Sequence, residues 1–448
     1  MRRELFAKYD VPVPRYTSYP TVPFWSSDLA GGDWVEDLRG TLGDEATTWA
    51  LYIHIPYCET LCTYCGCNTV ISRDHGNEEK YVGLIHREWA SYLERVPRLR
   101  ERPLRQLHLG GGTPTFLSAS SLRVLLEPIL GTITVPGGAF DSSIEVDPRR
   151  TSVEQLETLR ALGFTRVSMG VQDFNPEVQA LVNRLQPYEL TAALTRQARA
   201  LGYASINYDL IYGLPRQTAE RIERTARLTV DLRPDRIALY SLARVPWIKP
   251  AQRLFKDEDL PEGEAKRQLY ERARSILMEA GYHEMGMDHF ALPHDALAHA
   301  AGTGTLHRNF MGYTEFRTQV LLGLGVSAIS ETPACFHQNE KVLPVYERSV
   351  LSGEIPTLRG HRLSAEDRRQ RERILAFMTR FEVALDPGEQ ADARSFLAPL
   401  IEDGLVALEG PVLRLTPEGR PFLRNACVFF DHRLRRNAPG TRIFSKAL

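Results

Sequence analysis

The chain has 448 residues, of which 43% are hydrophobic and 25% charged, and its net charge of −1 argues against a nucleic-acid partner. This length allows a large buried core. The sequence contains no run of about 18 apolar residues, so we expect no membrane span. The N-terminal arginines are not followed by the apolar segment of a secretory signal. We therefore expect a cytoplasmic protein with one large domain and appended segments, working on neither nucleic acid nor membrane.

The first segment, residues 1–48, is predicted to be an extended arm. It carries Pro12, Pro14, Pro20 and Pro23 among aromatic residues and shows no lasting hydrophobic periodicity. Such a segment is too irregular to form an independent domain, so we expect it to pack on the rest of the chain.

From about residue 49 short apolar runs alternate with longer amphipathic stretches. Strands are predicted at residues 49–56, 105–112, 142–148, 166–172, 205–213 and 236–243. Residues 78–96 and 219–232 are two of the helices expected between them. A strand followed by a helix, repeated six times, predicts right-handed βαβ units and a parallel sheet.

A doubly wound sheet and an incomplete barrel both satisfy this alternation, and the polar residues favour the barrel. These residues fall within or just after the C-terminal half of a run: Cys58, Gly110–Thr113, Glu145, Gln172, Asp209 and Ala243. Barrels place their chemistry at these strand ends. We therefore predict an α/β fold, an incomplete (β/α)6-type TIM-like barrel, over residues 49–361.

Beyond about residue 281 the alternation fades, although residues 321–330 predict one more strand in the core. Residues 362–448 are expected to form a mainly helical accessory domain, with an arginine-rich helix, an apolar helix near 396–408 and a β-like pair within 405–420. That order resembles a winged helix. Because no basic patch interleaved with aromatic residues follows, we favour a lid on the barrel over a DNA-binding module.

Four of the six cysteines lie in one stretch of ten residues, 58–67. Cys58, Cys62 and Cys65 have the spacing C-x3-C-x2-C, and thiols crowded together in a reducing compartment favour metal over disulfides. Zinc normally takes four ligands, often in two separated pairs, and no second C-x2-C pair exists. Three thiolates would instead bind three irons of a 4Fe–4S cluster and leave one iron open. The spacing alone leaves zinc and the cluster as alternatives.

A glycine-rich turn, "GGGTPT" at residues 110–115, follows one strand after the cysteines. Three glycines permit close backbone approach and leave N–H and C=O groups free for a small polar ligand. Together with "CETLCTYC" (58–65), this turn resembles the radical S-adenosylmethionine (SAM) superfamily. The resemblance implies a partial barrel and a 4Fe–4S cluster whose open iron is chelated by SAM.

Further segments narrow the resemblance to the oxygen-independent coproporphyrinogen III oxidases (dehydrogenases) of haem biosynthesis. They run almost from end to end: "PRYTSYP" (14–20), "SIEVDPR" (143–149), "SMGVQDFN" (168–175), "DLIYGLP" (209–215), "GMDHFA" (286–291) and "LGVSAIS" (324–330). A haem chaperone and haem-degrading radical enzymes are the alternatives, and the Gly66-Cys67-Asn68 triplet argues against the chaperone. Residues 240–250 depart from the family's pattern on the expected substrate side.

The resemblance implies two SAM molecules per chain, the first of them on the cluster. Residues that match contacts to the first are Tyr52, Gly111, Glu145 and Ile329. Residues that match contacts to the second are Tyr64, Gly112, Thr113, Gln172, Arg184, Asp209 and Ala243. A carboxylate such as Glu145 suits the ammonium of SAM, an aromatic ring stacks on adenine, and an arginine pairs with a carboxylate. Alternatively, Glu145 is a solvated strand-end acid and Arg184 a surface arginine.

The implied activity is the anaerobic oxidative decarboxylation of two propionates of coproporphyrinogen III to vinyl groups, giving protoporphyrinogen IX, through a 5′-deoxyadenosyl radical. It requires the porphyrinogen, a reducing donor of the flavodoxin or ferredoxin type and an electron acceptor, and we expect a monomer. The arm, with Arg15 beside Tyr16, Thr17 and Tyr19, is predicted to close the site and bind propionates; the alternative is a surface strap.

The remaining cysteines and two strand histidines receive no ligand role. Cys67 is interpreted as a reserve thiol, a hydrogen donor near the radical or a packed small residue. Cys335 and Cys427 are predicted to be buried thiols. His54 and His108 lie within predicted strands, so we expect core histidines.

Overall fold

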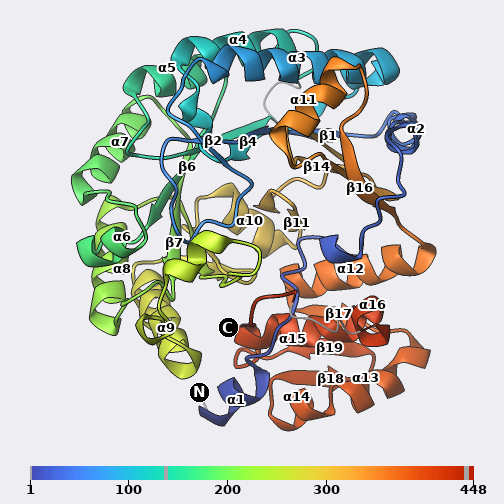
Figure 1. The fold of residues 1–448 in the computed structure, drawn as a ribbon. Coiled ribbons are helices and arrows are strands. Elements are labelled where there is room, and N and C mark those ends of the chain that lie inside the picture. Colours follow the sequence, from blue (N-terminus) through green and yellow to red (C-terminus); the bar gives the residue numbers. More distant parts are fainter. Residues whose placement is uncertain (1–2, 136–139, 438–442, 448) are drawn as a thin grey trace.

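The computed structural model describes residues 3–135, 140–437 and 443–447, and its centre is a twelve-stranded mixed sheet that curves into an open barrel (Figure 1). The six predicted strands are confirmed as neighbours that pair in parallel. They are β1 (Trp49–Ile55), β4 (Leu104–Gly111), β5 (Asp141–Val146), β6 (Arg166–Gln172), β7 (Ser205–Tyr212) and β8 (Arg236–Ser241). The barrel prediction is therefore confirmed over the doubly wound sheet.

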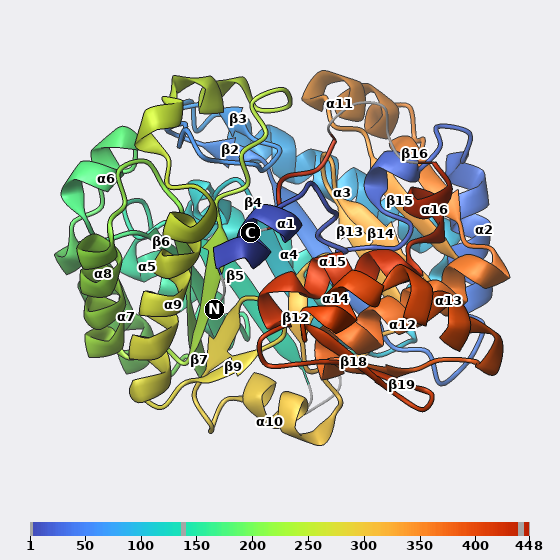
Figure 2. The ribbon, with the colours of Figure 1, turned by 90° about the horizontal axis from the view of Figure 1, so that it is seen from below.

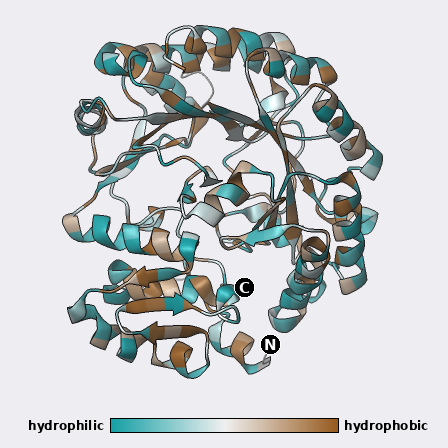
Figure 3. Cartoon of the chain, turned by 180° about the vertical axis from the view of Figure 1, so that it is seen from behind, coloured by the Kyte–Doolittle hydropathy of each residue, from teal (hydrophilic) through white to brown (hydrophobic). Residues whose placement is uncertain are grey.

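Helices cover the outside of this sheet, as Figures 1 and 2 show. They are α3 (Asn77–Arg95), α4 (Ala119–Leu130), α5 (Val153–Ala161), α6 (Pro176–Leu181), α7 (Tyr188–Ala200), α8 (Ala219–Leu232) and α9 (Gly263–Glu279). In α3 the residues Tyr81, Ile85, Trp89 and Tyr92 recur at helical spacing and are all buried. Figure 3 shows the result in colour, with mainly brown strands inside and helices of mixed teal and brown around them.

The stretch 321–330 was predicted as one strand, and the structure corrects this to two. β13 (Val320–Leu324) pairs in parallel with β1, and β14 (Ile329–Glu331) returns antiparallel to it. The chain reverses because Gly325 and Ser327 take φ values of 97° and 65°, in the left-handed region. The antiparallel edges of the sheet are β15 (Cys335–Asn339) and β16 (Thr357–Arg362) on one side, and β10 (His289–Ala291) and β9 (His283–Met285) on the other.

A buried carboxyl group joins α3 to this turn. Glu88 accepts hydrogen bonds from the Gly325 N–H at 2.8 Å, the Asn339 amide at 2.6 Å and the Tyr346 hydroxyl at 2.7 Å. Tyr346 lies in α11 (Leu343–Leu351). Burial raises the pKa of Glu88 to about 7 in spite of the three donors.

The N-terminal arm is not wholly extended, which corrects the prediction. It contains two helices, α1 (Arg3–Tyr9) and α2 (Gly31–Thr41), both too short to produce a lasting period in the sequence. α2 buries Trp34 and Leu38 in the main core, whereas Leu5 and Phe6 of α1 belong to a second core beneath the barrel.

The C-terminal part contributes the rest of this second core. It contains α12 (Ala365–Arg380), β17 (Glu382–Ala384), α13 (Gln390–Phe396), α14 (Ala398–Glu402), β18 (Val406–Glu409), β19 (Val412–Leu415), α15 (Leu423–Cys427) and α16 (His432–Arg436). The arginine-rich helix and the β pair are confirmed. The apolar helix predicted over 396–408 ends at Glu402, because Gly404, with φ of 74°, turns the chain into β18.

Arg424 fastens the two chain ends to one another. Its guanidinium donates to the carbonyls of Pro14 at 2.9 Å, Lys446 at 3.1 Å and Ala447 at 3.0 Å, and also to that of Val13. Figure 2 shows α1 and the C-terminus close together at the centre of this view. Residues 1–48 and 362–448 therefore share contacts, and their division into separate domains stays a prediction.

The shorter elements connect these parts. They are β2 (Tyr57–Cys58), β3 (Val70–Ile71), α10 (Ala296–Thr303), β11 (His307–Asn309) and β12 (Gly312–Thr314). Within the described ranges, none of the helices combines the length and apolar character that crossing a membrane demands. Cys335 and Cys427 are both buried, as predicted.

Candidate functional site

A cavity of about 360 Å³ lies at the C-terminal ends of the barrel strands. Eleven of the fourteen predicted site residues line it: Cys58, Cys62, Cys65, Tyr64, Gly111, Gly112, Thr113, Glu145, Gln172, Arg184 and Asp209. Tyr52, Ala243 and Ile329 are not part of its lining. The placement follows from the parallel strands, whose carboxyl ends meet at one rim.

Cys58 is the last residue of β2, and Cys62 and Cys65 lie on the loop between β2 and β3. Those strands pair in parallel, Tyr57 with Val70 and Cys58 with Ile71, and so fix both ends of the loop. Cys58 Sγ lies 3.3 Å from Thr113 Oγ1, at the glycine-rich turn. The Cys65 N–H donates to the Cys62 carbonyl at 3.1 Å.

In the part of the chain that the structure describes, no three His, Cys, Asp or Glu side chains converge as ligands of a single metal ion. Cys58, Cys62 and Cys65 all line the same cavity, and three cysteine thiols of this kind are a donor set that fits an iron–sulfur cluster. Burial raises the pKa of Cys58 to about 11. A hydrogen bond with Cys67 lowers the pKa of Cys65 to about 6.

Cys67 is exposed and lines the cavity, so its interpretation as a packed small residue is wrong. The other two interpretations, reserve thiol and hydrogen donor, remain open to experiment. The neighbouring Asn68 accepts a hydrogen bond at its carbonyl from His54 Nε2, at 2.9 Å.

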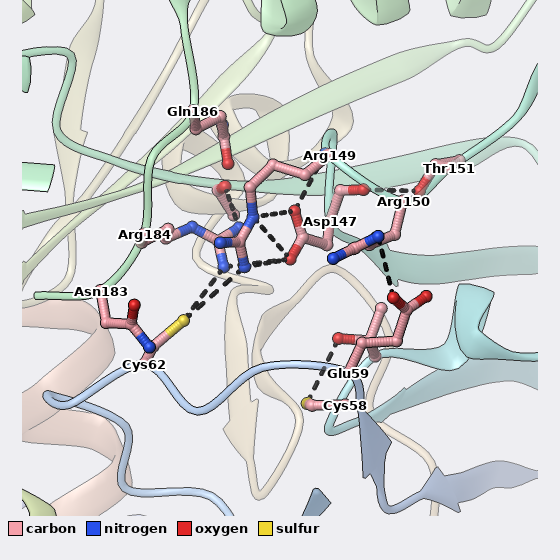
Figure 4. A network of polar contacts seen from close by, with 12 residues as sticks. Cys58, Glu59, Cys62, Asp147, Arg149, Arg150, Thr151, Asn183, Arg184 and Gln186 are labelled. Atoms are coloured by element: carbon pink, nitrogen blue, oxygen red, sulfur yellow. Dashed lines mark hydrogen bonds and ion pairs between the residues drawn. The ribbon is translucent and has the colours of Figure 1, made fainter. Parts of the chain in front are cut away.

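Two guanidinium groups face the sulfur of Cys62 (Figure 4). Arg184 Nη1 lies 3.6 Å and Arg149 Nη2 3.8 Å from Cys62 Sγ. Both arginines also contact Asp147 Oδ2, Arg149 at 2.7 Å and Arg184 at 3.3 Å. Burial alone would raise the pKa of Asp147, but the two cations hold it below its ordinary value. The site therefore places positive charge beside a thiol sulfur.

Sequence reasoning found only part of this network. Arg184 is 7% exposed, so the surface alternative for it is wrong. Asp147 and Arg149 were not singled out, although both belong to the quoted segment "SIEVDPR" that ends β5. Charged residues immediately after a buried barrel strand were the available signal.

The glycine-rich turn packs directly against the segment that leads to Cys58. A Cβ on Gly112 would lie 2.5 Å from the Pro56 carbonyl oxygen and 2.8 Å from that of Tyr57. The N–H groups of Gly112 and Thr113 donate to the carbonyls of Ile55 at 2.8 Å and Tyr57 at 2.9 Å. The expectation that these N–H groups are free for a ligand is therefore wrong, because they hold the cysteine loop in place.

Glu145 reaches the cavity with 44% of its side chain exposed there. His108 Nε2 lies 3.3 Å from Glu145 Oε1, and the Gly111 N–H donates to Oε2 at 3.2 Å. Burial opposes ionisation, but His108 and the Gly111 N–H together lower the pKa of Glu145. The carboxylate is therefore ionised at neutral pH and suits a cationic ligand group.

Tyr52 and the two strand histidines form the layer behind Glu145. The Tyr52 hydroxyl lies 3.0 Å from His54 Nδ1, and its ring stacks on that of His108 with 5.9 Å between centroids. His54 is buried with both ring nitrogens hydrogen-bonded, which confirms it as a core histidine. His108, in contrast, lines the cavity and contacts Glu145.

The remaining predicted residues lie further along the rim. Asp209 accepts from the Ser168 hydroxyl and the Asn207 amide, both at 3.0 Å, and burial raises its pKa to about 6. The buried Gln252 amide donates to the carbonyls of Tyr64 at 2.9 Å and Ala243 at 3.0 Å. Ala243 is thus tied to the cysteine loop from outside the cavity lining.

The arm reaches the end of β8. Arg15 Nη2 donates to the Ser241 carbonyl at 2.8 Å, and Arg308 Nη1 donates to the carbonyls of Arg15 and Tyr16 at 3.0 Å. Arg308 also lies over the ring of Tyr313, which lines the cavity. Tyr16 and Tyr19 are each 2% exposed and pack in the second core, so the prediction that these two residues help the arm to bind propionates is wrong.

Comparisons with known proteins place the chain in a family. Residues 52–229 match the model of the radical SAM superfamily. The chain is 40% identical over 444 residues to the oxygen-independent coproporphyrinogen III oxidase of Escherichia coli, covering 97% of this chain and 96% of the relative. The chain belongs to the oxygen-independent coproporphyrinogen III oxidases.

Other members of this family give the same result. The enzyme of Pseudomonas aeruginosa is also 40% identical, over 96% of this chain and 95% of its own. The solved structure of the Escherichia coli coproporphyrinogen III oxidase, described as a radical SAM enzyme, superimposes with a TM-score of 0.89 at 39% identity. It covers 94% of this chain and 98% of that chain, so the likeness to this oxidase includes the arm and the C-terminal part.

Proposed function

We propose that the protein catalyses the anaerobic oxidative decarboxylation of two propionate side chains of coproporphyrinogen III, which gives protoporphyrinogen IX. The observation that carries this proposal is the cavity that the three spaced cysteines and Glu145 line together at the ends of the barrel strands. Membership of the coproporphyrinogen oxidase family names the substrate class.

Cys58, Cys62 and Cys65 would hold a 4Fe–4S cluster through three of its irons. Glu145 would pair with the ammonium group of a first SAM molecule, because its carboxylate is ionised and partly exposed in the cavity. The other residues proposed for this molecule are Tyr52, Gly111 and Ile329. A second SAM molecule is proposed to contact Tyr64, Gly112, Thr113, Gln172, Arg184, Asp209 and Ala243.

When bound, the reduced cluster would supply the electron for cleavage of SAM into methionine and a 5′-deoxyadenosyl radical, and this chemistry would remove a hydrogen atom from a propionate. The chain's own residues position these groups and keep out water. The cavity wall also includes Tyr240, Met311 and Tyr313. Arg308 and Arg15 hold the arm behind that wall, so the arm is proposed to close this side of the site.

Each propionate loses a hydrogen atom, carbon dioxide and one electron. A low-potential donor of the flavodoxin or ferredoxin type is proposed to reduce the cluster, and an electron acceptor of unknown identity takes the substrate's electron. We propose that the enzyme works as a monomer.

The test is turnover by anaerobically reconstituted protein with coproporphyrinogen III, SAM and dithionite, followed by porphyrin chromatography. We expect about four irons and four sulfides per chain, and protoporphyrinogen formed together with methionine and 5′-deoxyadenosine. Cys62→Ser should lose iron and turnover, whereas Cys67→Ser should keep its iron. Stoichiometric haem binding without turnover would favour a haem chaperone, and about one zinc per chain without iron would contradict the proposal.

Arg15→Ala is the sharper test of the arm. Deleting residues 1–22 would also remove Leu5, Phe6 and Tyr9 from the second core, and its effect would mix folding with closure. Arg15→Ala should keep the iron and cleave SAM while forming less protoporphyrinogen per 5′-deoxyadenosine. An unchanged ratio of the two products would reduce the arm to a surface strap.

A further inference from the structure

Three cations lie together beside the cysteine loop. Lys249 follows β8, Lys341 follows β15, and Arg359 lies in β16; we call them the cation cluster. No ion pair within 4.0 Å joins any of the three to an acidic side chain in the described ranges. Burial and the charges of Arg359 and Lys249 lower the pKa of Lys341, so Lys341 lies within electrostatic reach of both other cations.

The cation cluster is tied to the backbone that continues from the third spaced cysteine. Lys249 Nζ donates to the Cys67 carbonyl at 2.7 Å, and the Asn68 amide donates to the Lys341 carbonyl at 3.1 Å. Cys67 and Asn68 follow Cys65 by two and three positions. Figure 2 shows β2 and β3 lying between the yellow-green segment after β8 and the elements α11 and β16.

Exposed apolar side chains stand next to two of these cations. Ile248 and Val342, the sequence neighbours of Lys249 and Lys341, are each 56% exposed. A surface with uncompensated cations and exposed apolar side chains suits a partner protein whose own surface is acidic. The alternative anionic partner for the cation cluster is the porphyrinogen, through its propionate carboxylates. None of the three cations is part of the cavity lining, which favours the protein partner.

We propose that the face formed by the cation cluster, Ile248 and Val342 is where an acidic electron-transfer protein docks to reduce the iron–sulfur cluster. This inference rests on the proposed function. In the step concerned the donor, a flavin or iron–sulfur protein, is oxidised by one electron and the cluster is reduced by one. Electron transfer weakens steeply with distance, and this face touches the loop that carries the cysteines.

The test compares two reductants on the same holoenzyme. One is dithionite, which needs no docking site, and the other is flavodoxin kept reduced by its reductase. The variants are Lys341→Glu and the double variant Lys341→Glu/Arg359→Glu. Arg227→Glu is the matched control, because Arg227 is an exposed cation on α8, on the other side of the barrel in Figure 1. Flavodoxin binding is also titrated directly, which requires no turnover.

For the double variant we expect the KM for flavodoxin and its dissociation constant to rise about tenfold at low ionic strength, with the dithionite-driven rate unchanged within about twofold. The wild-type affinity should fall as salt is added and screens the surface charges. Unchanged flavodoxin binding in the double variant would overturn the proposal. An equal loss of rate with both reductants would also overturn it and assign the cations to the substrate. Absence of turnover by the wild type with dithionite would instead count against the proposed function.

Discussion

Replacing Gly112 by alanine tests how the glycine-rich turn supports the cysteine loop. The new Cβ would lie 2.5 Å from the Pro56 carbonyl oxygen, whereas ordinary contacts begin at 3.4 Å. Both neighbours are backbone, the carbonyls of Pro56 and Tyr57, so no side chain can turn aside. Relieving the overlap requires a backbone shift of about 1 Å, at a cost of about 1–3 kcal/mol.

That shift falls on the two residues before Cys58, so it should displace the first cysteine from its partners on the same loop. We expect Gly112→Ala to remain folded but to retain less iron after anaerobic gel filtration. Its turnover should fall on the order of 100-fold, as for other misplacements of this size. Iron and sulfide analysis, near-ultraviolet circular dichroism and the turnover assay measure the three quantities.

Gly66→Ala is the matched control, because nothing lies within 4 Å of a Cβ at that position on the same loop. It should keep the iron content and the activity of the wild type. If Gly112→Ala behaves like Gly66→Ala in iron content and turnover, the backbone contact does not position the cysteines, and the reasoning fails.

Three further predictions concern electrostatics and stability. Arg149→Leu removes a cation 3.8 Å from Cys62 Sγ. Because that cation favours the reduced state of the bound cluster, which is the more negative one, its loss should lower the reduction potential by on the order of 50 mV. A spectroscopic redox titration measures this change. Arg150→Leu, which breaks an ion pair with Glu59, should leave that potential unchanged. Folding raises the pKa of Glu88 from 4.5 to about 7, so between those pH values the folded state holds a proton that the unfolded state releases. The stability that this group contributes should therefore fall as the pH rises from 4.5 to about 7. Glu88→Gln should remove this slope from denaturant unfolding measured across the same pH range, and an unchanged slope would assign it to another group. Arg424→Leu removes the side chain that donates hydrogen bonds to four backbone carbonyls of the two chain ends. It should lower the free energy of unfolding by about 3 kcal/mol or more. A loss under about 0.5 kcal/mol would show that those ends are held by packing alone.

The amino-acid sequence by itself determined the barrel and the nature of the site. Strands β1 and β4 to β8 are short apolar runs with local boundaries, and periodicity of this kind needs no partner to be recognised. The cysteine spacing and the "GGGTPT" turn are equally local. The spacing alone left zinc and a 4Fe–4S cluster as alternatives, and the resemblance to the radical SAM superfamily decided between them. Parallel pairing then brought the polar residues after each strand to one rim.

The tertiary structure decided the contacts between distant parts of the chain. Arg149 contacts Cys62 across 87 positions, and Arg424 contacts Pro14 across 410, and neither pairing leaves a signal in a local window. The reversal at Gly325 and Ser327, which divides one apolar run into β13 and β14, depends on Glu88 of α3 accepting the freed Gly325 N–H. A hydrogen bond of this kind forms only once the helix and the turn are packed together. The sequence therefore specified the elements and the chemical groups, whereas packing decided which arginines face the cysteines and which core holds the arm.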